Sequence, residues 1–220
     1  MLISEIFSSI EGEGLRTGYL ATFIRTYGCN LRCSYCDSMY AVEEKKDLFR
    51  NNTYKNMSLD EIAEECQRLG NKRITLTGGE PLIQKSVSAL LGQLKACGFE
   101  INIETNGAVP LDAFAMMPVM LTMDWKSPYS GMREKMIEKN LGLLREWDVL
   151  KFVVANKEDL DDMKKVILEH KPICHIFVSP VFGEIELVDI VNYMKENNLQ
   201  QVRLQLQMHK LIWDKNKRGV

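Results

Sequence analysis

Three of the six cysteines lie within eight residues, as Cys29, Cys33 and Cys36. Such a loop can bring three thiolates together, and thiolates select zinc, copper(I) or iron–sulfur clusters. A structural zinc ion needs four ligands, so a distant residue such as Cys66 or His209 would have to complete that site. A cubane [4Fe–4S] cluster on three cysteines would instead leave one iron open to a small molecule. The spacing leaves both interpretations open.

The composition is typical of a water-soluble globular protein and excludes several other classes. The chain has 220 residues, of which 45% are hydrophobic and 26% charged, so we expect one domain over residues 1–220. The net charge of −2 argues against nucleic-acid binding. No apolar run reaches ~18 residues, and residues 1–14 lack the pattern of a signal peptide. We therefore expect a cytoplasmic protein with no membrane partner, in which Cys66, Cys97 and Cys174 are reduced core residues.

Hydrophobic patterns of period 2 and 3.6 alternate along the chain, which indicates parallel strands joined by helices. The fold class we expect is α/β, as a partial, open (β/α) barrel of about six parallel strands, because a full barrel needs ~250 residues. We expect strands at residues 2–10, 21–26, 73–77, 100–104, 119–123, 149–154, 175–179 and 202–207. Helices are expected at residues 59–69, 84–96, 133–145, 156–170 and 184–196. Residues 39–56 show no clear period, and residues 208–220 are expected to form a solvated basic tail.

Polar motifs follow four of these strands directly. The cysteines come after the strand that contains Arg25, and Gly78-Gly79-Glu80-Pro81 comes after the next strand. Thr105-Asn106 and Asp124-Trp125-Lys126 follow the two strands after that. Ligands of parallel sheets bind at the carboxyl ends of the strands, so we expect these motifs to form one site.

The cysteine spacing, with the aromatic Tyr35 before the last cysteine, resembles that of the radical S-adenosylmethionine (SAM) enzymes. This resemblance implies a [4Fe–4S] cluster on Cys29, Cys33 and Cys36, with SAM on the fourth iron. It also implies reductive cleavage of SAM to a 5′-deoxyadenosyl radical. The residues that it places along SAM are Tyr35, Cys36, Asp37, Gly78, Gly79, Glu80, Thr105, Asn106, Asp124 and Lys126.

Both ends of the chain resemble a narrower family. Ile10-Glu11-Gly12-Glu13-Gly14, Cys36-Asp37-Ser38 and the ending from His209 to Val220 are similar to the 7-carboxy-7-deazaguanine synthases of queuosine and 7-deazapurine biosynthesis. The resemblance implies a lyase that contracts 6-carboxy-5,6,7,8-tetrahydropterin to 7-carboxy-7-deazaguanine. Ammonia is lost, and Mg²⁺ assists.

The same resemblance assigns individual roles. Ser38 would bind Mg²⁺, and Arg25 would pair with the pterin carboxylate. The other substrate contacts implied are Ile10, Glu11, Gly12, Glu13 and Thr77. In the C-terminal tail, His209 and the terminal carboxylate of Val220 would close the active site on the pterin. Two positions depart from the family pattern: Glu11 stands where Gln is common, and only Lys126 matches in Asp124-Trp125-Lys126. A carboxylate accepts hydrogen bonds, whereas an amide also donates them.

The expected partners are the pterin, a reductant such as flavodoxin or ferredoxin, and a second copy of the chain in a homodimer. Two alternatives remain. A glycyl-radical-enzyme activase would share the cysteine motif but would not require the Glu-Gly-Glu-Gly turn. A zinc-binding interaction module would use the cysteines without SAM.

Overall fold

Two N-terminal strands form an antiparallel hairpin that begins the sheet. In the computed structural model, which describes residues 1–42, 54–214 and 217–219, β1 (Leu2–Ile10) pairs antiparallel with β2 (Leu20–Thr26). The short strand β3 (Lys55–Asn56) pairs with the outer edge of β1. Tyr19 O accepts from Glu11 N at 2.8 Å, and Glu11 O accepts from Gly18 N at 2.9 Å, so the turn between β1 and β2 is closed by backbone hydrogen bonds.

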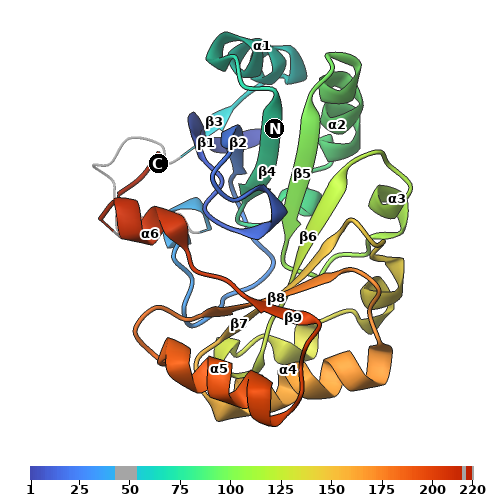
Figure 1. Ribbon diagram of the computed structural model, residues 1–220. Helices are drawn as coiled ribbons and strands as arrows, with labels where there is room; N and C mark the ends of the chain where they lie inside the picture. Colours follow the sequence, from blue (N-terminus) through green and yellow to red (C-terminus); the bar gives the residue numbers. More distant parts are fainter. Residues whose placement is uncertain (43–53, 215–216, 220) are drawn as a thin grey trace.

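The remaining strands continue from β2 in parallel, which confirms the predicted α/β architecture. Within the described residues the order is β3-β1-β2-β4-β5-β6-β7-β8-β9, and every neighbouring pair from β2 onward is parallel. The sheet curves without closing (Figure 1). The added strands are β4 (Arg73–Gly78), β5 (Glu100–Thr105), β6 (Met120–Trp125), β7 (Val149–Val154), β8 (His175–Pro180) and β9 (Val202–Leu204).

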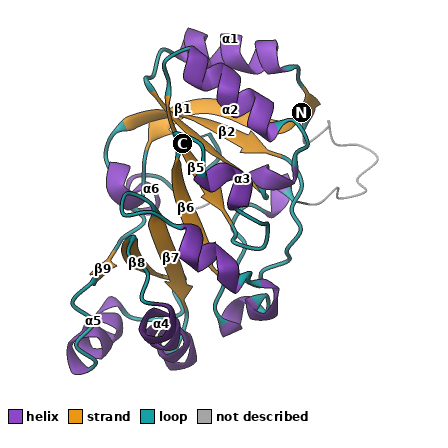
Figure 2. Cartoon of the chain, turned by 90° about the vertical axis from the view of Figure 1, so that its right-hand side faces the viewer, coloured by secondary structure: helices purple, strands orange, loops and turns teal. Residues whose placement is uncertain are grey.

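Of the six α-helices in the described residues, five lie along the outer face of this curved sheet, and the sixth lies apart from them beside the N-terminal hairpin (Figures 1 and 2). The outer helices are α1 (Leu59–Leu69), α2 (Val87–Ala96), α3 (Asp112–Ala115), α4 (Lys157–His170) and α5 (Leu187–Glu196). The sixth is α6 (Met208–Ile212). Ser58 and Glu61 form the predicted capping box of α1, in which each side chain accepts from the other's backbone N–H.

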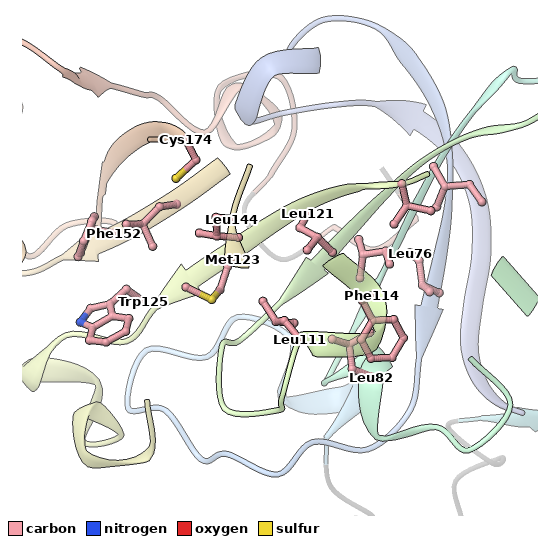
Figure 3. Packing of buried hydrophobic residues seen from close by; sticks show 14 of the residues in the cluster. Leu76, Leu82, Leu111, Phe114, Leu121, Met123, Trp125, Leu144, Phe152 and Cys174 are labelled. Atoms are coloured by element: carbon pink, nitrogen blue, oxygen red, sulfur yellow. The ribbon is translucent and has the colours of Figure 1, made fainter. Parts of the chain in front are cut away.

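Strand alternation separates a hydrophobic face from a polar one. Leu76, Leu121, Met123 and Phe152 belong to the buried core under the outer helices (Figure 3). The intervening residues of the same strands face the interior of the partial barrel, where Thr122 Oγ1 donates to Asn102 Oδ1 at 3.0 Å. The polar members of the interior-facing set on β4 to β7 are Thr75, Thr77, Asn102, Glu104, Thr122, Asp124 and Lys151. The concave side of the sheet is therefore polar and available for a site.

Three expectations about the outer elements are wrong. Residues 133–145 contain the 3₁₀ segments Arg133–Lys135 and Glu138–Leu143 instead of an α-helix, because Asn140 binds the backbone of Gly107 and Val109. Cys97 is exposed, although Cys66 and Cys174 are buried as expected. The predicted basic tail contains α6, and its Lys210 is only 13% exposed. Within the described chain, no helix combines the length and apolar character needed to cross a bilayer.

Candidate active site

The cysteine loop follows β2 and is held by the segments after three other strands. Gly28 O accepts from Glu80 N at 2.9 Å, and Asn30 Nδ2 donates to Ala108 O at 3.1 Å. Ser34 N donates to Ser130 O at 3.1 Å. The loop is thus fixed at the carboxyl edge of the sheet, which is where the sequence places it.

The three thiols are free and partly exposed, and polar groups lie close to them. Cys29 Sγ lies 3.4 Å from Leu31 N and 3.6 Å from Asn106 Nδ2. Burial raises the pKa of Cys33 and of Cys36, and the Lys126 ammonium opposes this shift at both thiols. Donors and a cation beside sulfur favour the thiolate that binds metal.

The three free thiols of the loop fit a cubane cluster that leaves one iron open. Among the residues described, no three His, Cys, Asp or Glu side chains converge at the distances of one metal ion. A cubane presents separate irons to separate cysteines, so its ligands need not converge on one point. Cys66, the distant zinc ligand considered from the sequence, lies in the hydrophobic core, where burial raises its pKa to about 12.

Two glycines at the end of β4, its last residue Gly78 and the next residue Gly79, allow the strand ends to approach. A Cβ on Gly78 would overlap the backbone of Thr26, and a Cβ on Gly79 would overlap the backbone of Gly28. Gly78 also has a φ of +143°, which side chains disfavour. The glycines therefore bring the Gly78–Glu80 backbone against the start of the cysteine loop.

Glu80 ties the ends of β4 and β5 together. Its Oε1 accepts from Leu82 N at 3.0 Å and from Thr105 Oγ1 at 2.9 Å, and its Oε2 accepts from Asn106 N at 2.7 Å. Burial raises the pKa of Glu80 to about 7, and these hydrogen bonds work in the opposite direction. Both carboxylate oxygens are already bonded to protein, so Glu80 shapes the backbone around Asn106.

Four charged side chains form a continuous row across the interior. Lys126 Nζ lies 2.7 Å from Asp124 Oδ2, and Lys151 Nζ lies 3.1 Å from Asp124 Oδ1 and 3.1 Å from Glu13 Oε2. Although burial opposes its ionisation, the two lysines lower the pKa of Asp124 to about 2. Asp124 is thus an ion-paired carboxylate between Lys126 and Lys151.

Two buried oxygens near this row find no hydrogen-bond partner among the described residues, namely the Tyr35 hydroxyl and Glu13 Oε1. Tyr35 stacks on Tyr129 with ring centroids 6.3 Å apart, and Lys126 Nζ lies 5.9 Å from the Tyr35 ring. Burial raises the pKa of Tyr35 to about 12, so its hydroxyl stays protonated. An orphaned buried polar atom is what a bound polar ligand can satisfy.

Glu11 is buried in the floor of the barrel beside Thr75, whose hydroxyl donates to it. Burial and the nearby Glu104 raise the pKa of Glu11 to about 7, although Arg16 and Arg73 pull it down. Glu104 in turn accepts from Thr77 Oγ1 at 2.7 Å. A cavity of about 10 Å³, the size of a single water, lies beside Glu11 and is also lined by Arg16 and Glu104.

Arg25, the penultimate residue of β2, already has a protein partner. Its Nε donates to Glu5 Oε1 at 2.7 Å, and the Tyr40 hydroxyl donates to the same oxygen at 2.7 Å. The guanidinium also lies 5.8 Å from the Phe7 ring centroid. Glu5 thus occupies the Nε of the Arg25 guanidinium, which leaves the two terminal nitrogens as the donors for a substrate carboxylate.

Helix α6 contacts both the N-terminal turn and the end of the cysteine loop. Met208 N donates to Gly12 O at 3.0 Å, and the His209 ring packs on Gly12. Burial lowers the pKa of His209. Lys210 Nζ lies 3.4 Å from Asp37 Oδ2, and Ser38 Oγ donates to Asp37 Oδ1 at 3.0 Å. Val220 lies outside the described residues.

The structure thus gathers most of the predicted site, together with three residues that the sequence analysis missed. Lys151 and Glu104 face the interior, and Gln205 Oε1 accepts from Gly14 N at 2.6 Å. Strand alternation could have identified both residues, because Lys151 is the charged residue of an otherwise apolar strand and Glu104 alternates with the apolar Ile101 and Ile103 of β5. Nothing in the sequence around Gln205 marks its contact with the turn.

Comparisons with known proteins agree with this geometry. The family model of the radical SAM superfamily matches residues 23–143. The chain is 44% identical to the 7-carboxy-7-deazaguanine synthase of Clostridium acetobutylicum, covering 99% of this chain and 98% of the relative. It is 39% identical to the synthase of Methanospirillum hungatei, covering 96% and 85%.

Two solved structures share the fold. QueE from Escherichia coli is similar with a TM-score of 0.72, 23% identity and 94% coverage of both chains. SAM-bound SuiB from Streptococcus suis has a TM-score of 0.55 and 13% identity, over 81% of this chain and 48% of SuiB. The chain therefore belongs to the radical SAM superfamily and, within it, to the 7-carboxy-7-deazaguanine synthase family.

Proposed function

We propose that this protein contracts 6-carboxy-5,6,7,8-tetrahydropterin to 7-carboxy-7-deazaguanine with loss of ammonia, as a lyase. The observation that carries the proposal is the docking of His209 on Gly12, which brings the two family-specific ends of the chain together beside the cysteine loop. A glycyl-radical activase would need no such closure. A zinc module would need a fourth ligand, but Cys66 lies in the hydrophobic core and His209 packs on Gly12.

In this proposal Cys29, Cys33 and Cys36 hold a [4Fe–4S] cluster, which with SAM supplies one-electron chemistry that starts with hydrogen abstraction from the substrate. Protein groups orient SAM: the backbone at Gly78 and Gly79 accepts from its ammonium, and Lys126 faces its carboxylate or ribose. The unpartnered Tyr35 hydroxyl supports a polar ligand here. The other residues proposed to contact SAM are Cys36, Asp37, Glu80, Thr105, Asn106 and Asp124.

The pterin would lie between the turn and the interior strands. Arg25 binds its carboxylate through the nitrogens that Glu5 leaves open, and His209 covers it from α6. The proposed contacts from the turn and β4 are Ile10, Glu11, Gly12, Glu13 and Thr77, and Val220 is a further proposed contact. Because Glu11 is buried with a pKa of about 7, its protonated form can donate a hydrogen bond, as Gln does.

Mg²⁺ is proposed to bind the Ser38 hydroxyl together with substrate oxygens and waters, since Mg²⁺ takes oxygen ligands and keeps several waters. Asp37 lies 3.0 Å from Ser38 Oγ and can orient that hydroxyl. Lys210 pairs with the other Asp37 oxygen, so this carboxylate is already neutralised by protein.

The proposal includes a cytoplasmic reductant such as flavodoxin or ferredoxin, and a homodimer. Six free cysteines suit a reducing compartment. Exposed apolar side chains on α5, including Val188 at 61% exposure, suit burial against a second copy. Light scattering of wild type and Val188→Glu tests the dimer.

Anaerobic turnover tests the function. Cluster-loaded protein, SAM, Mg²⁺ and a chemical reductant should convert the carboxytetrahydropterin to a product with the mass of 7-carboxy-7-deazaguanine. Cys33→Ala is the matched control and should give no product. Loaded wild type that consumes SAM without releasing this product would contradict the proposal.

A further inference from the structure

Lys151 joins the two halves of the site. It is the third residue of β7 and is 9% exposed. Its Nζ lies 3.1 Å from Asp124 Oδ1 on β6 and 3.1 Å from Glu13 Oε2 in the N-terminal turn. Asp124 uses its second oxygen for Lys126, at 2.7 Å. Asp124 therefore pairs with Lys126 and Lys151, and Lys151 pairs with Asp124 and Glu13.

The ends of this row face different ligands in the proposed function. At one end, Lys126 Nζ lies 5.9 Å from the Tyr35 ring in the cysteine loop. At the other end, Glu13 belongs to the turn that packs on His209, and its second oxygen is buried without a partner among the described residues. The row thus runs from the SAM side of the barrel to the pterin side.

Electrostatics make Lys151 the group on which this arrangement depends. Three carboxylates act on its ammonium: Asp124 and Glu13 in direct contact, and Glu104 from β5, two strands away in the sheet. These carboxylates keep the pKa of Lys151 above its ordinary value, although burial alone would lower it. Without this ammonium, Asp124 would pair with Lys126 alone, and Glu13 would lose its ion pair.

We propose that Lys151 is a positioning residue that holds the SAM side and the pterin side of the site in register without contacting either ligand. The inference rests on the proposed function for the identity of the two ligands. It predicts that a single lysine controls two affinities through two different carboxylates. Replacing a lysine that only stabilises the fold would lower stability, but it would not lower SAM affinity through Asp124 and pterin affinity through Glu13.

The test measures SAM and pterin affinities separately in anaerobic, cluster-loaded enzyme, with iron content and melting temperature recorded for every variant. Lys151→Met should weaken both affinities by about tenfold, the usual scale for coupled neighbours. Lys151→Arg keeps the charge and should recover most of each affinity. Lys157→Met removes an exposed ion pair with Asp161 on α4, and both affinities should remain at wild-type values.

Two double variants trace the path. In an Asp124→Asn background, adding Lys151→Met should cause no further loss of SAM affinity. In a Glu13→Gln background, it should cause no further loss of pterin affinity. The Asp124→Asn/Lys151→Met protein loses one positive and one negative charge, so its net charge is unchanged. If Lys151→Met alone does not fold, this double variant can still be compared with Asp124→Asn.

Either of two results would overturn the inference. One is wild-type affinity for SAM or for the pterin in folded Lys151→Met. The other is that Lys151→Met lowers affinity in both double variants as much as it does in the wild-type background. Failure of the proposed function looks different. In that case wild type would not bind the pterin, whereas the SAM arm would still show whether Lys151 acts through Asp124.

Discussion

The His209 imidazole lies so close to the backbone of Gly12 that a Cβ at residue 12 would overlap Nδ1 of the ring. Met208 N also donates to Gly12 O at 3.0 Å, so the contact combines a hydrogen bond with tight packing. Helix α6 can dock on the turn in this way because residue 12 is glycine.

Gly12→Ala should therefore displace His209 and weaken pterin binding by about tenfold or more, since the turn has no room for the added methyl. Iron content should stay at the wild-type value, because the cysteine loop is anchored by other segments. Gly92→Ala is the control: its Cβ meets nothing within 4 Å in α2, and stability should hold or rise. Unchanged pterin affinity in Gly12→Ala would show that the contact has no role in binding.

Glu11→Gln should change how stability depends on pH. The pKa of Glu11 is about 7 in the folded protein against 4.5 ordinarily, so folding takes up a proton between these values. Its contribution to stability therefore falls as the pH rises from about 4.5 to about 7. The melting temperature of Glu11→Gln minus that of wild type should therefore be larger at pH 8 than at pH 5. Equal shifts at both pH values in Glu11→Gln would contradict the prediction.

Replacing cysteines one at a time should separate ligands from structural residues. Ala at Cys29, Cys33 or Cys36 should abolish the cluster spectrum. Ala at Cys66, Cys97 or Cys174 should leave iron content unchanged. The buried Cys66→Ala should lose about 1 kcal/mol of stability, whereas the exposed Cys97→Ala should lose almost none. Loss of iron from any of these last three variants would show that the ligand assignment is wrong.

Arg25→Lys should bind SAM normally but lose most hydrogen abstraction from the pterin. Lysine keeps the positive charge but lacks the parallel N–H donors of the guanidinium that match a carboxylate. The measurement is deuterium transfer from C6-labelled substrate into SAM. Glu5→Gln separates the alternatives, since it weakens the Arg25 ion pair but leaves the guanidinium in place. If Arg25 serves only Glu5, the two variants should behave alike, and wild-type transfer in both Arg25→Lys and Arg25→Ala would exclude a substrate role.

Ser38→Ala should weaken the response of turnover to Mg²⁺ and leave the cluster intact, because it removes one oxygen ligand and nothing from the cysteine loop. Ser38→Thr keeps the hydroxyl and should retain the response. A Mg²⁺ titration curve of Ser38→Ala that overlays wild type would remove Ser38 from the proposed site.

The alternation of strands and helices was predictable because each element carries its own local signal. The capping box at Ser58 and the β-branched residues of β4 are signals carried by a few neighbouring residues, and the structure contains both elements. The helix expected at residues 133–145 failed because Asn140 bonds to backbone from a segment far away in sequence. A single sequence does not show such long-range hydrogen bonds.

The same distinction holds for the site. Motifs at strand ends were found from their order along the chain, as with Asn106 after β5. The partners of Arg25 and Glu80 were not found, because an ion pair with Glu5 and a carboxylate shared with Thr105 depend on how strands align. Strand alternation marks Lys151 as a charged residue in an apolar strand, but its role was missed because that role depends on its neighbours across the sheet.

The placement of α6 sets an order of events during synthesis. Gly12 and Asp37 leave the ribosome early, whereas the helix that contacts both is made only after β9. A nascent chain can therefore form the cysteine loop and the hairpin well before His209 and Lys210 are available to cover them. The loop stays accessible until residues 208–212 are made and cover it.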